Sequence, residues 1–246
     1  MNKLNMTRLI NDIKELKNNP IENIHYQHDE ENMLKGYAMI IGTENTPYAY
    51  GNYLFEFNFP ITYPFDPPTV IYYTNDGSTR FNPNLYVCGK VCLSILNTWK
   101  GEGWTSCLNI KSVLLILSTI LNDTPIINEP GLSINHCDND NYNNMLKYKN
   151  LEVAIIGILN KKYLNSKFNI FYDIIVEKYF SNKNNILKNL NELKNELQDN
   201  NIIRFNLYNS KYLVNFMHLE NKINNLETTL KNFVTTLKNF ETILLK

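Results

Sequence analysis

The 246-residue sequence has no excess of charge of either sign and no long hydrophobic run. Acidic and basic residues number 24 each, so no overall field draws the chain toward nucleic acid or an anionic membrane. The longest apolar runs, 113–117 and 154–159, are much shorter than the roughly 20 residues that span a bilayer. The first residues also lack the continuous apolar segment of a secretory signal. We therefore expect a soluble protein of the cytoplasm or nucleus, with neither nucleic acid nor a membrane as its partner.

Alanine and arginine are scarce, whereas asparagine, lysine, isoleucine and tyrosine are abundant. AT-rich coding DNA produces this composition, and parasites and large viruses are among its sources. For such a source, the expected location is the cytoplasm of a host.

Cysteine and histidine are also few, with four of each. In a reducing compartment, four cysteines do not imply a disulfide framework. A structural zinc site takes four Cys or His ligands, usually in closely spaced pairs. Cys88 and Cys92 have this spacing, but His25 and His28 lie in a predicted strand, where positions three apart point to opposite faces. No second pair is found among Cys107, His136, Cys137 and His218. We therefore predict no metal site, no cofactor and one functional thiol.

A helix is predicted at the start of the chain. Thr7 is a suitable N-cap residue, and the apolar positions that follow share one helical face. The helix is expected to end near Asn18, because Pro20 follows it.

Strands are predicted next, over 33–41 and 51–59. The second alternates, with aromatic residues on one face and Glu56 and Asn58 on the other, so we expect it to be half-buried. A proline-rich loop then leads into a short strand over 70–73, since prolines do not fit inside a helix or a central strand.

A strongly apolar helix is predicted over 108–121, and its hydrophobic circumference indicates burial. Helices and strands are therefore segregated along the chain, which is the pattern of an α+β fold. The length allows a catalytic domain of about 150 residues with an extension.

Several motifs stand in a fixed order: YPFDPP, FNPN, GKVCLSIL, a tryptophan, an apolar helix and NEPG. From Arg8 to about Gly131 this series resembles the ubiquitin-conjugating enzymes, which carry ubiquitin as a thioester and pass it to lysine. The family signature begins His-Pro-Asn, whereas this chain has Asn82, Pro83 and Asn84. The motifs RFNPN, TWKGEGW and NEPG are more similar to the large Z-type branch, whose members also have Asn in place of His. The resemblance implies the family's fold, with an N-terminal helix, an antiparallel meander sheet, a buried central helix and C-terminal helices.

By this resemblance, Cys92 is the nucleophile that accepts ubiquitin, since it stands eight positions after Asn84 as in the family. When a lysine amine attacks the thioester, negative charge develops on the carbonyl oxygen, and a fixed donor stabilises it. Asn84 would donate to that oxygen or pin the loop that does, with support from Asn82 and Pro83. An Asx turn beside Pro83 is the simpler interpretation of Asn84.

The attacking lysine must lose a proton, and an acidic residue can orient it and favour that loss. Glu129 matches a position in a gating loop where relatives often carry an acidic residue or serine. An exposed glutamate before Pro130 could equally be a solvated loop charge. Ser94 is near a position where many relatives have Asp, and the absence of that charge makes Glu129 the stronger candidate for the acidic role.

The resemblance also assigns partner surfaces. Phe65 matches an exposed aromatic residue that docks ubiquitin ligases, and Thr105 and Ser106 match a second docking loop, where relatives usually have Ser-Pro. A basic face for the activating enzyme is matched by Arg8, Lys14 and Lys17. Three cations on a helix are also typical of its solvated side.

The C-terminal half departs from the family core. We predict a catalytic core over 1–150, packed helices over 151–200 and a helical extension over 201–246. Apolar residues in the last segment recur at steps of three and four, which predicts a coiled coil or a long amphipathic helix. These positions are Phe216, Leu219, Ile223, Leu226, Leu230, Phe233, Leu237, Phe240 and Leu244. Self-association through 216–244 and docking onto the core are both open.

The leading hypothesis is a carrier that receives ubiquitin from an activating enzyme on Cys92 and passes it to lysine of a substrate protein, usually with a ligase. Cys88 is then a bystander, or a redox partner of Cys92. One alternative keeps this chemistry with another ubiquitin-like modifier. A second is a catalytically weak scaffold that assembles through its C-terminal helix.

Overall fold

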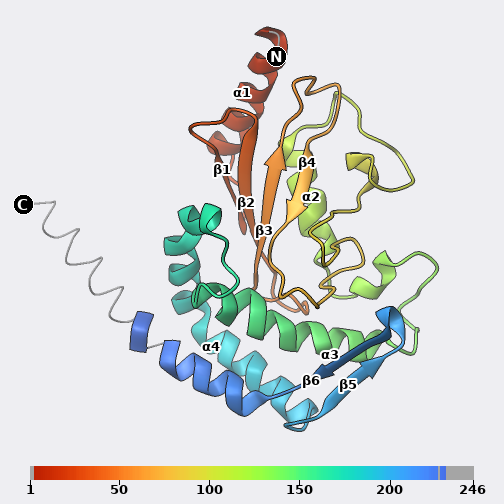
Figure 1. The fold of residues 1–246 in the computed structure, drawn as a ribbon, viewed down its shortest axis with the longest axis vertical. Coiled ribbons are helices and arrows are strands. Elements are labelled where there is room, and N and C mark those ends of the chain that lie inside the picture. The colour runs from red at the N-terminus through yellow and green to blue at the C-terminus, as the bar shows by residue number, and fades with distance from the viewer. Residues whose placement is uncertain (1–2, 227, 231–246) are drawn as a thin grey trace, which may run out of the picture.

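A computed structural model describes residues 3–226 and 228–230 (Figure 1). Its first part consists of α1 (Lys3–Asn18), the strands β1 (Ile24–His28), β2 (Lys35–Ile41), β3 (Asn52–Asn58) and β4 (Thr69–Tyr72), and α2 (Ile110–Ile120). The strands form one antiparallel sheet in the order β1-β2-β3-β4. The predicted α+β fold is confirmed. Within the described ranges, no helix combines the length and the apolar character needed to cross a membrane.

The helix α1 begins earlier than predicted. Thr7 lies inside it and does not cap it, because the helix already starts at Lys3. Lysine, leucine and methionine before Thr7 are good helix formers, so they extend the helix past a residue that could have begun it. The core-facing side is as expected, with Leu9 and Leu16 buried.

The strand β3 is buried on both faces, so the expectation of a half-buried strand is wrong. Glu56, assigned to the solvent side, is only 4% exposed. A later segment, η4 (Ser166–Phe171), covers this face of the sheet. Its Lys167 forms an ion pair with Glu56, and Phe168 packs edge-on against Tyr37 at 5.7 Å between ring centroids. The charge of Glu56 is thus tolerated inside because it is paired.

The predicted apolar helix is present as α2. Asn109 caps it, accepting a hydrogen bond of 2.9 Å from the backbone N–H of Ser112. Its side facing α1 and the sheet is fully buried, while Leu115 on the opposite side remains 43% exposed.

The C-terminal half begins with α3 (Asn139–Lys149), which continues as a π-helical stretch (Asn150–Gly157). After η4, the helix α4 (Tyr172–Glu196) runs unbroken for 25 residues, within the stretch over 151–200 where packed helices were predicted. Both helices lie across one end of the sheet in Figure 1, and they pack on each other.

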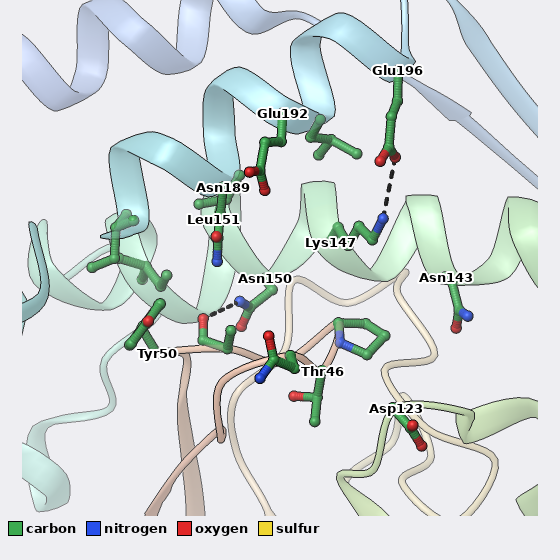
Figure 2. Close-up of a pocket in the computed structure, with 16 residues that line it drawn as sticks. Thr46, Tyr50, Asp123, Asn143, Lys147, Asn150, Leu151, Asn189, Glu192 and Glu196 are labelled. Carbon is green, nitrogen blue, oxygen red and sulfur yellow. Dashed lines mark hydrogen bonds and ion pairs between the residues drawn. The ribbon is translucent and has the colours of Figure 1, made fainter. Parts of the chain in front are cut away.

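Buried Asn150 joins this half to the sheet. Its side-chain amide donates to the carbonyl of Ala49 at 2.8 Å, and its side-chain oxygen accepts from the Tyr53 hydroxyl at 2.8 Å. Figure 2 shows the first of these hydrogen bonds, which lies in a polar crevice of about 250 Å³ between α3, α4 and the loop before β3. The crevice is crossed by an ion pair of 3.1 Å between Lys147 and Glu196.

The segment predicted as a helix from residue 201 starts instead with a hairpin, β5 (Ile202–Phe205) and β6 (Ser210–Leu213), which packs beside α3. Residues of β5 alternate between exposed and buried, as expected for a strand with one face on the core. A helix then begins at Phe216. Of the heptad positions, Phe216, Leu219, Ile223, Leu226 and Leu230 are buried in the protein's own core. Phe233, Leu237, Phe240 and Leu244 lie outside the described residues.

Candidate active site

Cys92 lies in an irregular segment just before the short helix η1 (Ser94–Leu96). It is 2% exposed and is held by two hydrogen bonds to Asn84. The backbone N–H of Cys92 donates to the carbonyl of Asn84 at 2.8 Å, and the Asn84 side-chain amide donates to the carbonyl of Cys92 at 2.6 Å. The backbone of Cys92 is therefore fixed at both its N–H and its carbonyl.

Asn82 anchors the same loop to the core of the protein. It is fully buried, and its side-chain amide donates to the Tyr48 hydroxyl at 2.9 Å and to the Ile120 carbonyl at 2.7 Å. Its side-chain oxygen accepts from the backbone N–H of Asn84 at 3.0 Å. The loop is thereby tied to the end of α2, and this explains why an amide side chain stands here: it can donate and accept at once.

Thr98 is a residue that sequence reasoning missed. Its hydroxyl accepts from the backbone N–H of Leu93 at 2.9 Å and donates to the carbonyl of Val91 at 2.8 Å. It thus bridges the two neighbours of Cys92. No motif or periodicity marks this threonine, because its partners are backbone groups.

A narrow cleft of about 20 Å³, room for about one water molecule, opens beside Cys92. The structure brings Cys92, Asn84 and Glu129 together along it, although Glu129 is far away in the sequence. The other lining residues are Arg80, Pro83, Tyr86, Trp99, Asn128 and Pro130. Ser94 is half-buried in η1 and does not line the cleft.

Glu129 is not a free loop charge, because Tyr208 donates its hydroxyl to the Glu129 carboxylate at 2.5 Å. Burial and this contact with Glu129 raise the pKa of Tyr208, so the phenol stays protonated as the donor. The same ring lies 4.7 Å from the guanidinium carbon of Arg80, which also stacks on Tyr86 at 3.5 Å. Sequence reasoning missed Tyr208, although asparagines around it between two alternating segments are a hairpin signal.

The turn that leads into the active-site loop is held by Asp76. Its carboxylate accepts from the backbone N–H groups of Ser78 and Thr79 at 3.0 and 2.8 Å, and pairs with Lys149 of α3 at 3.1 Å. Burial raises the pKa of Asp76, but Lys149 and the backbone donors outweigh it and lower the pKa to about 2. This ion pair therefore persists at neutral pH.

Residues 8–150 match the sequence profile of the family described as ubiquitin-conjugating enzyme. The chain belongs to the ubiquitin-conjugating enzyme family. It is 37% identical over 158 residues to ubiquitin-conjugating enzyme E2 Z of Danio rerio, covering 63% of this chain and 48% of the relative. The human E2 Z is 36% identical over 160 residues, which is 64% of this chain and 45% of that protein. A probable ubiquitin-conjugating enzyme E2 26 of Arabidopsis thaliana is 46% identical over 125 residues, or 49% and 23%.

These matches confirm the family and the similarity to its Z-type branch. The chain spans about half the length of the E2 Z proteins that it matches. The family match ends at residue 150, inside the continuous helical stretch of α3 and the residues that follow it.

In this member of the ubiquitin-conjugating enzyme family, the two predicted ligase-docking loops are neighbours. Phe65 is 70% exposed, and Thr105 and Ser106 are also exposed. The indole N–H of Trp104 donates to the carbonyl of Pro64 at 2.7 Å and so links the two loops. The structure thus gathers these residues on one exposed surface.

The predicted basic face on α1 is divided. Lys14 and Lys17 are exposed. Arg8, by contrast, forms an ion pair of 2.8 Å with buried Asp12 and donates to the carbonyls of Ser106 and Leu108 at 3.1 and 2.9 Å. Its guanidinium therefore ties α1 to the second docking loop and does not stand free beside the lysines.

All four cysteines are free, and Cys92 alone among them is buried. Exposed Cys88 lines a separate groove on the other side of the segment. His25 and His28 lie on β1, as expected.

A further group of side chains offers three metal-ligating atoms. His136, Cys137 and Asp138 place these atoms within 4.8 Å of one another, although the first two are adjacent in the chain. The Asp138 carboxylate already accepts from the backbone N–H of Leu207 at 2.9 Å. Three ligands, one of them engaged, fall short of the four of a structural zinc site.

Proposed function

We propose that this chain is a ubiquitin carrier that accepts ubiquitin as a thioester on Cys92 and transfers it to lysine. The observation that carries this proposal is the convergence of Cys92, Asn84 and Glu129 on one cleft. Family membership supports the same chemistry, and the names of the E2 Z relatives supply the modifier.

In the first step, the Cys92 thiolate attacks the carbonyl carbon of the thioester on an activating enzyme. A new carbon–sulfur bond forms, the old one breaks, and the activating enzyme's thiolate leaves. Because one thioester replaces another, the thiol needs no strong activation. Because Cys92 is 2% exposed, its thiol reaches the substrate only when the cleft widens, and Trp99 and Pro130 are the exposed residues that line it.

In the second step, a lysine amine attacks the thioester carbonyl of ubiquitin. An isopeptide bond forms, the Cys92 thiolate leaves, and the amine loses a proton to solvent or to Glu129. One amide hydrogen of Asn84 is used on the Cys92 carbonyl. An amide nitrogen carries two, so the other can donate to the oxyanion while the loop stays pinned.

The partner surfaces belong to the same proposal. Phe65 with Thr105 and Ser106 forms the ligase surface, and the activating enzyme approaches along Lys14 and Lys17. Arg8 then contributes by positioning α1 against the ligase loop. Cys88 is a bystander, since it lines another groove.

A second candidate is a scaffold that keeps the fold with little transfer. It is not favoured, because five positions of the C-terminal apolar seam are buried in the protein's own core and are not available to a partner. Such a protein would hold its partners without forming a thioester.

The test is a charging assay with purified full-length protein, ATP, ubiquitin and a panel of activating enzymes. We expect an adduct on a non-reducing gel that thiol reductant removes. Cys92→Ala should abolish it, and Cys92→Ser should give an adduct that resists the reductant, because an oxygen ester does not exchange with thiols.

Cys88→Ala and Cys107→Ala are the matched controls and should charge like the parent protein, since both thiols are exposed away from the cleft. The absence of an adduct with ubiquitin, from protein shown to be folded, would contradict the proposal. Charging by another ubiquitin-like modifier alone would change the cargo and keep the chemistry.

A further inference from the structure

The hairpin β5–β6 reaches the active-site cleft through one side chain. Tyr208 lies in the turn of this hairpin and donates its hydroxyl to one oxygen of the Glu129 carboxylate at 2.5 Å. The other carboxylate oxygen has no hydrogen-bond partner among the described residues. The hairpin lies outside residues 8–150, the part of the chain that matches the family.

The backbone of Tyr208 is in an unfavourable conformation, with φ 61° and ψ 15°. Bulky residues rarely adopt this left-handed region, so surrounding contacts must hold it there. Two such contacts are present. The Asp138 carboxylate accepts from the backbone N–H of Leu207 at 2.9 Å, and the Tyr208 ring packs on buried Tyr142 at 6.2 Å. Asn209 also has a positive φ, of 48°, so the turn of the hairpin places two successive residues in this region and presents the Tyr208 ring toward Glu129.

The same ring contacts Arg80, which lines the cleft and donates to the carbonyl of Pro83 at 2.7 Å. Tyr208 itself does not line the cleft. It therefore stands behind two cleft residues, one acidic and one basic, and leaves the space in front of Cys92 open.

The backbone of Glu129 is held by its own loop, since its N–H donates to the carbonyl of Ile126 at 3.0 Å and its carbonyl accepts from Leu132 at 3.1 Å, but these bonds do not fix the side chain. Pro130 is exposed, and Gly131 takes a positive φ of 81°, which a glycine adopts readily. Without a fixed partner, the carboxylate could rotate away from the cleft.

We propose that Tyr208 is a positioning residue that aims the Glu129 carboxylate at the incoming lysine. This inference rests on the proposed function. One carboxylate oxygen accepts the phenol proton and fixes the side chain, and the other accepts an N–H of the substrate amine. As the amine nitrogen bonds to the thioester carbon and Cys92 leaves as a thiolate, the surplus proton passes from the amine to Glu129 and then to solvent. Holding the acceptor in place lowers the entropic cost of that step.

The test separates charging from discharge. Full-length protein is first charged with ubiquitin, the activating enzyme is stopped, and the thioester is chased with free lysine over a range of concentrations. Tyr208→Phe removes the hydroxyl and keeps the ring beside Arg80 and Tyr142. The matched control is Tyr212→Phe on β6 of the same hairpin, whose hydroxyl reaches the carbonyl of Ser78 at 3.4 Å and not Glu129.

We expect Tyr208→Phe to charge at the parent rate and to discharge to lysine roughly tenfold more slowly, the size of effect that one hydrogen bond to a charged group produces. Tyr212→Phe should match the parent in both steps. In a Glu129→Gln background, Tyr208→Phe should add little further loss, because the two residues act as one unit. A purely structural role would slow discharge by the same factor in both backgrounds.

Three outcomes would overturn the inference. If Tyr208→Phe discharges at the parent rate, Tyr208 does not position Glu129. If it discharges or charges faster than the parent, the contact between Tyr208 and Glu129 inhibits the reaction. An equal loss with and without Glu129 would make Tyr208 a fold residue only. If the parent protein forms no thioester at all, the proposed function fails and this inference fails with it, so the charging step tells the two failures apart.

Discussion

The side-chain amide of Asn84 donates a hydrogen bond of 2.6 Å to the carbonyl oxygen of Cys92, and the backbone N–H of Cys92 returns one of 2.8 Å to the carbonyl of Asn84. This pair joins two segments that each carry part of the family's signature. The amide therefore fixes the backbone of Cys92, and both residues line the same cleft.

Asn84→Ala is expected to spare charging of Cys92 and to slow discharge to lysine by about a hundredfold, the loss typical of removing one oxyanion donor. Charging depends less on this donor, because the attacking group is a strongly nucleophilic thiolate and one thioester replaces another. The measurement is the pair of rates in single-turnover assays. An equal loss in both steps would contradict the oxyanion role and indicate collapse of the loop that Asn82 supports.

Asp76→Asn is expected to destabilise the fold in a pH-dependent way. The pKa of Asp76 is lowered to about 2 from an ordinary value near 3.8, so its charged form stabilises the folded state above about pH 4. This contribution, about 2 kcal/mol, is lost as the pH falls through 2. Urea unfolding of parent and variant should therefore differ most at pH 7 and converge between pH 4 and pH 2.

The control for this prediction is Asp66→Asn, which changes an exposed carboxylate. Its unfolding free energy should stay close to that of the parent at each pH. A difference between Asp76→Asn and the parent that persists unchanged at pH 2 would show that the ion pair with Lys149 is not its cause.

Phe216→Ala is expected to lower the free energy of unfolding by about 3–4 kcal/mol, because a fully buried aromatic ring that packs edge-on on Tyr148 is removed. Met217→Ala, at the neighbouring position, is the control and should cost less than about 0.5 kcal/mol, since Met217 is 66% exposed. The measurement is chemical denaturation of both variants. Similar stabilities would mean that the start of the seam does not dock on the core in solution.

Local sequence determined the centre of this protein. Pro83, Asn84 and the spacing to Cys92 specify one loop, because the hydrogen bonds between Asn84 and Cys92 join residues only eight positions apart. Hydrophobic periodicity was sufficient for α2, because its apolar surface is continuous along the chain. Those parts of the prediction needed no knowledge of distant residues.

Other features depended on contacts between distant segments. The face of β3 that carries Glu56 reads as solvent-exposed, but η4 and the π-helical stretch before it, both about a hundred residues later, cover it. Arg8 reads as a surface cation, and only the fold places the carbonyls of Ser106 and Leu108 within its reach. In both cases the local sequence pattern is the same whether or not the distant segment packs against it.

The sequence by itself determined the family, through its ordered motifs, and the α+β class, through the order of the helical and strand patterns along the chain. Tertiary structure alone decided that Tyr208 meets Glu129, at a separation of 79 residues. Such a contact has no local signature, since its energy comes from a hydrogen bond that exists only after the hairpin has packed beside α3. The contact of Tyr208 with Glu129 was therefore found only in the folded chain.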